Sequence, residues 1–162
     1  MKFFYLSIII VLLDQSSKIF IKHYWIENNL FYDKINLIGN YVRFVFIENP
    51  GIAFGIDTSN YHLYITFFTI LAIVVLILHL YKLVLNDSYE CLPWSFILGG
   101  AIGNCIDRIV VLIPGSGYRG VIDFIDIGFG QYRWYTFNIA DASITIGLIV
   151  YLYQTYILKE KN

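Results

Sequence analysis

Residues 62–81 read HLYITFFTILAIVVLILHLY, twenty positions without an aspartate, glutamate, lysine or arginine. A helix of this length and apolarity spans the roughly 30 Å hydrocarbon core of a bilayer. Runs of similar length that are mostly apolar, each with one or two charged residues, occupy residues 3–21, 93–113 and 138–158. The sequence therefore predicts a mainly α-helical membrane protein with four transmembrane helices.

The overall composition favours the same class of protein. Of the 162 residues, 58% are hydrophobic, 19% are aromatic and only 14% are charged. The formal net charge of −1 offers no basic surface to a phosphate backbone, so nucleic acid is not an expected partner. Because the chain has two cysteines and no HExxH pattern, we expect no metal and no other cofactor. We expect one membrane-embedded domain over residues 1–162.

Four spans place both termini on one side of the membrane and two long connections, residues 22–61 and 114–137, on the other. Lysines and arginines fall on both sides, so the positive-inside rule does not decide the orientation. The segments on the side of the termini are very short, which makes their positive charge denser. This density favours cytoplasmic termini and extracytoplasmic long connections.

The two long connections carry strand-like patterns. Tyr41–Glu48 is strand-like, with β-branched and aromatic residues between Arg43 and Glu48. Asn49–Gly51 is typical of a turn, and Ile52–Ile56 is compatible with a second short strand. In the other connection, Gly120–Ile127 and Gln131–Thr136 are also β-like. We expect both connections to join one small extracytoplasmic β-sheet, a cradle that rests on the outer leaflet.

The first span contains an acid and a base four residues apart. Asp14 and Lys18 share a helix face in the order that favours an ion pair. Asp14 lies near the middle of the span, where an unpaired charge would cost at least about 2.5 kcal/mol. We therefore expect a buried pair that supports a site, with a purely structural pair as the alternative.

The third span combines small and polar residues. Gly99 and Gly103 form a GxxxG pattern that lets another helix backbone come close. Asn104, Asp107 and Arg108 follow at spacings of three and four, so they line one face towards the outer end. This face either holds helices together by hydrogen bonds or lets Asn104 and Arg108 bind a substrate.

Two aspartates flank the start of the last span. Asn138 and Asp141 have the spacing of a helix cap with an acidic residue in the first turn. Asp123 lies in the preceding strand-like segment, and a strand that returns to a helix start can bring two carboxyl groups together. Two neighbouring carboxyl groups share a proton, which suits aspartic peptide hydrolysis. Asp126 remains an alternative partner, although in an extended strand it would face away from Asp123.

Two other function classes are compatible with buried charges. In a transporter or proton channel, residues such as Asp14, Asp107 and Asp141 would form a polar path through the membrane. In a scaffold subunit the polar pairs would only hold helices together. The absence of inverted repeats in the sequence argues against a transporter.

The motifs taken together resemble those of the lipoprotein signal peptidase (signal peptidase II) family. The resemblance covers most of the chain and runs through five stretches in order. These stretches are Asp14–Lys18, Asn49–Gly55, Gly99–Arg108, Val121–Phe124 and Phe137–Asp141.

The resemblance implies an aspartic endopeptidase that removes the signal peptide from diacylglyceryl-modified bacterial prolipoproteins, on the amino side of the lipidated cysteine. It implies a multi-pass protein of the bacterial inner (cytoplasmic) membrane, with its site near the outer face and in contact with membrane lipid. We also expect a monomer and a target of globomycin-type cyclic peptide inhibitors. The implied roles are catalytic for Asp123 and Asp141, substrate-binding for Asn49, Asn104, Arg108 and Asn138, and site-stabilising for Asp14, Lys18 and Asp107.

Overall fold

The computed structural model describes residues 2–30, 33–51, 61–86 and 88–158. Its long helices are α1 (Lys2–Glu27), α2 (His62–Leu85), α3 (Cys91–Val111) and α4 (Ile139–Tyr153). Within the described residues, α1, α2 and α3 are long and apolar enough to cross a membrane. The 15 α-helical residues of α4 are continued by a π-helix over Gln154–Leu158. The structure is thus that of a mainly helical membrane protein, and the predicted fourth span corresponds to α4 and this extension.

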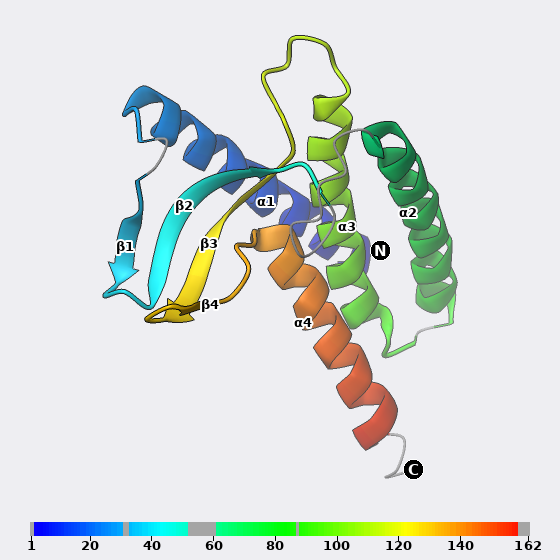
Figure 1. Ribbon diagram of the computed structural model, residues 1–162. Helices are drawn as coiled ribbons and strands as arrows, with labels where there is room; N and C mark the ends of the chain where they lie inside the picture. Colours follow the sequence, from blue (N-terminus) through cyan, green and yellow to red (C-terminus); the bar gives the residue numbers. More distant parts are fainter. Residues whose placement is uncertain (1, 31–32, 52–60, 87, 159–162) are drawn as a thin grey trace.

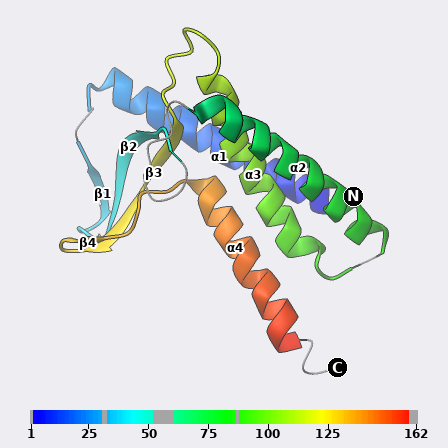
Figure 2. The same cartoon turned by 45° about the vertical axis from the view of Figure 1, so that its right-hand side comes forward.

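Helix α3 is the centre of the bundle, because α1, α2 and α4 all contact it (Figure 1). Small residues allow these approaches. A Cβ atom at Gly100 would collide with the Ala140 carbonyl of α4, while Gly99 and Gly103 lie against Ile10 and Asp14 of α1. The GxxxG interpretation is therefore confirmed. Figure 2 shows that α2 and α4 diverge from each other on either side of α3.

Helix α1 continues to Glu27, six residues beyond the predicted end of its apolar run at Ile21. The reason is tertiary. Ile21 and Trp25 are 3% and 1% exposed and form one core with Ile122 and Phe124 of the sheet. The C-terminal end of α1 is thus stabilised by the sheet that packs on it, which periodic apolarity alone does not reveal.

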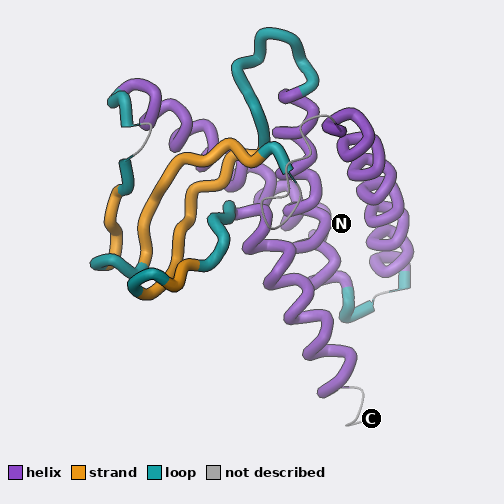
Figure 3. The backbone as a smooth tube through the Cα atoms, in the orientation of Figure 1, coloured by secondary structure: helices purple, strands orange, loops and turns teal. Residues whose placement is uncertain are grey.

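The sheet has the strand order β1-β2-β3-β4 and is antiparallel throughout. Pairing between β2 (Val42–Asn49) and β3 (Val121–Phe129) joins the two long connections, which confirms that prediction (Figure 3). Strand β1 (Ile35–Ile38) was not expected. Strand β4 covers only Tyr132–Arg133 of the predicted strand Gln131–Thr136, because its ladder with β3 consists of these two residues, paired with Phe129 and Gly128. The possible strand Ile52–Ile56 lies outside the described residues.

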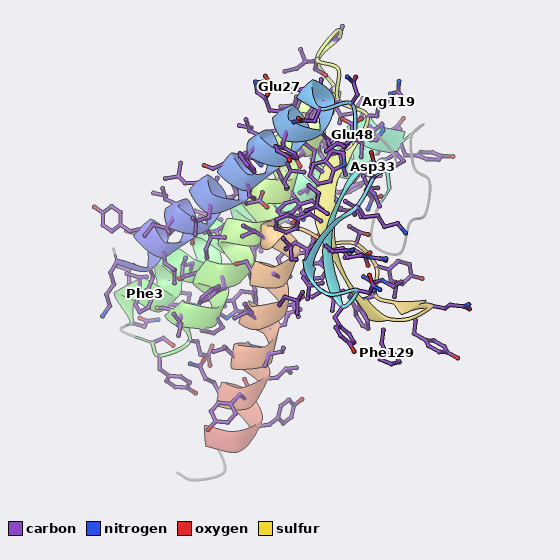
Figure 4. The ribbon with its side chains drawn as sticks, turned by 90° about the vertical axis from the view of Figure 1, so that its left-hand side faces the viewer. Phe3, Glu27, Asp33, Glu48, Arg119 and Phe129 are labelled. Atoms are coloured by element: carbon purple, nitrogen blue, oxygen red, sulfur yellow. The ribbon has the colours of Figure 1, made fainter. Side chains whose placement is uncertain are left out.

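The sheet and the helix bundle meet near the C-terminal end of α1. Figure 4 shows Glu27 and Phe3 at opposite ends of α1, with Arg119 near the upper edge of the view beside Glu27. The chain turns after β2 as predicted, where the Gly51 amide donates to Oδ1 of Asn49 (3.0 Å). This turn, together with α3, β3 and the start of α4, carries polar residues of the site.

Candidate active site

A cavity of about 770 Å³ lies where the sheet meets helices α2, α3 and α4. Asp123 and Asp141 both line it, so the structure brings together the two carboxylates that the sequence singled out. The cavity wall is otherwise mixed, with apolar residues from the sheet and helices. Its further polar side chains are those of Asn49, Thr69, Asn104, Arg108, Thr136 and Thr145.

Asp123 is 4% exposed and is held by neutral amides. Nδ2 of Asn49 donates to its Oδ2 (3.0 Å), and Nδ2 of Asn138 donates to its Oδ1 (2.8 Å). Burial raises the pKa of Asp123 to about 6; the charge of Asp141 adds to the rise, while these hydrogen bonds and the charge of Lys18 oppose it. Asp123 therefore titrates in the range where a carboxyl group can carry a proton near neutral pH.

Asp141 occupies the third position of α4, and Asn138 is the N-cap. Oδ1 of Asn138 accepts from the Asp141 amide (2.9 Å), and Oδ2 of Asp141 accepts from the Asn138 amide (3.3 Å), which completes a capping box. The predicted cap is confirmed. The other oxygen of Asp141 accepts from Nδ2 of Asn104 (2.7 Å).

The two asparagine side chains connect the carboxylates. Nδ2 of Asn138 donates both to Asp123 (2.8 Å) and to Oδ1 of Asn104 (3.1 Å). Since Nδ2 of Asn104 donates to Asp141, a continuous hydrogen-bonded path of amides runs between the two acids. The cap of α4 is therefore also part of the site, because the Asn138 side chain bonds to both Asp123 and Asn104.

Beneath the amides lies a buried charge network. Lys18, 1% exposed, contacts Asp14 at 2.8 Å and Asp107 at 3.0 Å, and its Nζ also donates to Oδ1 of Asn104 (3.0 Å). The expected pair within α1 is thus confirmed as part of a larger cluster. Because each charge has partners, the cost of its burial is offset.

Each acid of this network also holds a main-chain segment of the site. Oδ1 of Asp14 accepts from the Ala140 amide in the first turn of α4 (2.8 Å). Oδ2 of Asp107 accepts from the Ile122 amide, next to Asp123 on β3 (3.1 Å). Asp107 thus faces α1 and β3, rather than the cavity face that Asn104 and Arg108 line. The network fixes the two backbones that carry the cavity carboxylates.

Arg108 lines the cavity, and its Nη1 donates to the Asn104 carbonyl (3.2 Å). Asp126 does not line the cavity and forms ion pairs away from it. Its carboxylate pairs with Arg43 (2.7 Å) and Arg133 (2.8 Å). The alternative in which Asp126 meets Asp141 is therefore not supported by the geometry.

Gln15 is a further residue of the site that the sequence did not single out as a site residue. Its Nε2 donates to the Gly103 carbonyl and to Oδ1 of Asp107, both at 3.0 Å. It thereby braces α1 against α3 beside the charge network. The available signal was a polar amide next to Asp14 inside an apolar run. Among the residues that the structure describes, no three His, Cys, Asp or Glu side chains are placed to hold a metal ion.

Comparison with known proteins gives consistent results. The profile of the Signal peptidase (SPase) II family matches residues 6–157. A lipoprotein signal peptidase of Blochmanniella pennsylvanica is 34% identical over 159 residues, covering 96% of this chain and 89% of that protein. One from Cellvibrio japonicus is 35% identical and covers 99% of this chain and 89% of its own length.

A solved structure described as a bacterial membrane enzyme, determined by the in meso method at 1.9 Å resolution, has a similar fold. It is 26% identical, the match covers 96% of this chain and 93% of that one, and the TM-score is 0.70. The match of the family profile spans all five sequence motifs and both cavity carboxylates. The chain therefore belongs to the signal peptidase II family of aspartic peptidases.

Proposed function

We propose that Asp123 and Asp141 are the catalytic pair of this peptidase. We also propose that it removes the signal peptide from diacylglyceryl-modified prolipoproteins, cutting on the amino side of the lipidated cysteine. The supporting observation is that both carboxylates line one cavity and are hydrogen-bonded by asparagine amides. Within the described residues, neither carboxylate has a salt-bridge partner. Membership of a peptidase family argues against the transporter and scaffold alternatives.

The raised pKa of Asp123 supports a division of roles within the pair. Asp123 is the neutral acid and donates its proton to the oxygen of the scissile carbonyl. Asp141 is the carboxylate and takes a proton from a water molecule as the water oxygen bonds to the carbonyl carbon. Amide hydrogen bonds hold both groups in place before substrate arrives, so little reorganisation is needed.

The second step breaks the carbon–nitrogen bond. Asp141 returns its proton to the leaving nitrogen, while Asp123 takes a proton from one hydroxyl of the tetrahedral intermediate as the carbonyl re-forms. The products are the carboxyl end of the signal peptide and the free amine of the lipidated cysteine. Both aspartates are back in their starting protonation states.

The remaining polar residues divide into two roles. Asn49, Asn104 and Arg108 line the cavity, which supports contacts from their side chains to the peptide backbone of the substrate. Asn138 is fully buried and bonded to both Asp123 and Asn104, so we assign it a positioning role instead of substrate contact. Asp14, Lys18 and Asp107 stabilise the segments that carry the catalytic pair.

The same proposal includes the placement of the protein in the bilayer. We propose a single domain with four spans, the fourth made of α4 and its π-helical continuation, with both termini cytoplasmic and the site near the outer face. Thr69, Ala101 and Ile144 place α2, α3 and α4 along the cavity wall, which supports access for a lipidated peptide from the membrane side. We further propose that a globomycin-type cyclic peptide binds in this cavity and that the enzyme acts as a monomer.

The test is cleavage of a purified diacylglyceryl-modified prolipoprotein by the protein in detergent, followed by gel shift. The wild type should cut it, and the same precursor without the lipid should be cut far more slowly. Asp123→Asn and Asp141→Asn should each lose at least about 10³-fold in kcat, because the shared proton is removed. An uncut substrate with folded wild type would refute the proposed function, and an active Asp123→Asn variant would refute the assignment of the pair.

A further inference from the structure

Lys22 lies on α1 one turn beyond Lys18, and it connects three parts of the chain. Its Nζ lies 3.0 Å from Oε1 of Glu48 on β2 and donates to the Gly117 carbonyl (2.9 Å) in the connection between α3 and β3. The same ammonium lies 3.3 Å from the ring centroid of Tyr118. The Lys22 and Glu48 side chains are only 15% and 16% exposed. The Lys22 ammonium thus contacts a carboxylate, a main-chain carbonyl and an aromatic face at the same time.

Both segments that Lys22 holds lead directly to Asp123. On one side, Glu48 precedes Asn49, whose Nδ2 donates to Asp123. On the other side, Gly117 and Tyr118 precede β3, which carries Asp123. The Asn49 backbone packs so closely on Gly120 that a Cβ atom there would collide with it. The end of β2 and the start of β3 therefore behave as one packed unit.

We propose that Lys22 is a positioning residue for the catalytic pair, because it fixes the end of β2 against the approach to β3 and thereby sets the Asn49–Asp123 hydrogen bond. The inference rests on the proposed catalytic role of Asp123. Lys22 itself touches neither Asp123 nor the cavity wall, so its effect passes through Asn49.

The hydrogen bond from Asn49 gives this proposal a distinctive signature. It opposes the effect of burial on the pKa of Asp123, so a weaker bond raises that pKa further. The charged groups that face Asp123 are Asp141 from α4, Lys18 from α1 and Arg108 from α3. Within the described part of the chain, Lys22 contacts Glu48, Gly117 and Tyr118, and none of these contacts involves the three groups. If the Lys22–Glu48 contact were purely structural, its loss would lower the stability of the protein slightly, since a partly exposed ion pair contributes little. The pH dependence of cleavage would then stay unchanged.

The experiment compares Lys22→Met and Lys22→Arg with Lys34→Met, a control at an exposed lysine. All are assayed on the diacylglyceryl-modified precursor in parallel with wild type and Asp123→Asn. Lys22→Met should lower kcat about tenfold with a KM change below twofold, and the alkaline limb of its pH profile should move upward. Lys22→Arg should restore most of the activity, because a guanidinium can pair with Glu48 and stack on Tyr118. Lys34→Met should match wild type.

A double-mutant cycle with Asn49→Ala tests the route of the effect. If Lys22 acts through Asn49, Lys22→Met should add less than twofold to the loss already caused by Asn49→Ala. Multiplicative losses, or an unchanged pH profile in folded Lys22→Met, would overturn the inference. The proposed function would then still stand, because its failure would instead appear as an inactive wild type or an active Asp123→Asn variant in the same assay.

Discussion

Two aspartates three residues apart on β3 have opposite surroundings. Asp123 and Asp126 are 4% and 6% exposed, so both are buried. Across the β2–β3 pairing, Asp126 lies opposite Arg43 and Asp123 lies opposite Ile47. One carboxylate therefore accepts from guanidinium groups, while the other accepts from the side-chain amides of Asn49 and Asn138. The cross-strand neighbour is part of this difference, because Arg43 pairs with Asp126 and Ile47 cannot pair with Asp123.

The difference has a simple electrostatic cause. Removing a carboxylate from water disfavours its charged form, and a nearby cation offsets that cost. Asp126 has two such cations, Arg43 and Arg133. The side chains that donate hydrogen bonds to Asp123, those of Asn49 and Asn138, are neutral. Burial, with the charge of Asp141 added, raises the pKa of Asp123 to about 6 against the opposing effect of these hydrogen bonds. Among the residues that the structure describes, Asp123 thus lines the cavity without a direct ion pair, whereas Asp126 is paired with two arginines.

The largest expected effect comes from giving Asp123 the partner that Asp126 has. Ile47→Arg places a guanidinium opposite Asp123 at a cavity-lining position. The pair should ionise Asp123 at all working pH values and lower kcat/KM by about 10²-fold or more, since one general-acid group is lost. Cleavage of the lipidated precursor by gel shift measures this loss.

Ile47→Met is the matched control, since it keeps an apolar side chain of similar size. It should retain activity within about threefold. Equal losses in both variants would mean that the site responds to the shape of residue 47 and not to charge, and the comparison between the two aspartates would fail.

A smaller effect is expected from a change of one pH unit. Below about pH 6 Asp123 holds its proton, and above that value it loses it. The pair then carries two negative charges and lacks the proton for the scissile carbonyl. We expect kcat/KM of the wild type to fall about tenfold per pH unit on the alkaline side of this pKa. A pH series on one substrate in one detergent measures it, and a flat profile between pH 6 and 9 would contradict the proposed acid role.

The smallest effect on catalysis is expected from Asp126→Asn. It leaves Arg43 and Arg133 without their anion, so stability should fall by about 2 kcal/mol, less than for a fully buried pair because both arginines are partly exposed. Activity measured well below the melting temperature should stay within about threefold of wild type. Thermal unfolding in detergent gives the first quantity and the gel-shift assay the second. Loss of activity without loss of stability would instead place Asp126 in the chemistry.

Much of the helical architecture could be predicted from the sequence, because apolarity over about 20 residues is a local property. The ends of the helices and the edge strands were less predictable. Helix α1 extends to Glu27 because Trp25 is buried under the sheet, and β1 forms because it pairs with β2. Both depend on contacts between distant residues.

In the candidate site, too, some residues follow from local sequence and others from contacts between distant parts of the chain. Asn138 and Asp141 were predictable from the spacing of a capped helix, whereas the choice of Asp123 over Asp126 needed the resemblance to the family motif. The roles of Gln15 and Lys22 were not predictable, since each bonds to residues more than 25 positions away. A polar side chain in or beside an apolar run indicates that a partner exists, but not which one.

The sequence by itself determined that this is a membrane protein, where its apolar helices lie and which carboxylates are worth testing, because transfer to lipid and motif spacing depend only on the order of residues. The tertiary structure alone decided how those carboxylates differ. Strand register placed Arg43 opposite Asp126 and Ile47 opposite Asp123, and close packing of α1, α3 and α4 delivered the amides and charges that surround the cavity. Electrostatic interactions act over a few ångströms in space, so the protonation of a buried acid follows from its neighbours in the fold and not from its neighbours in the chain.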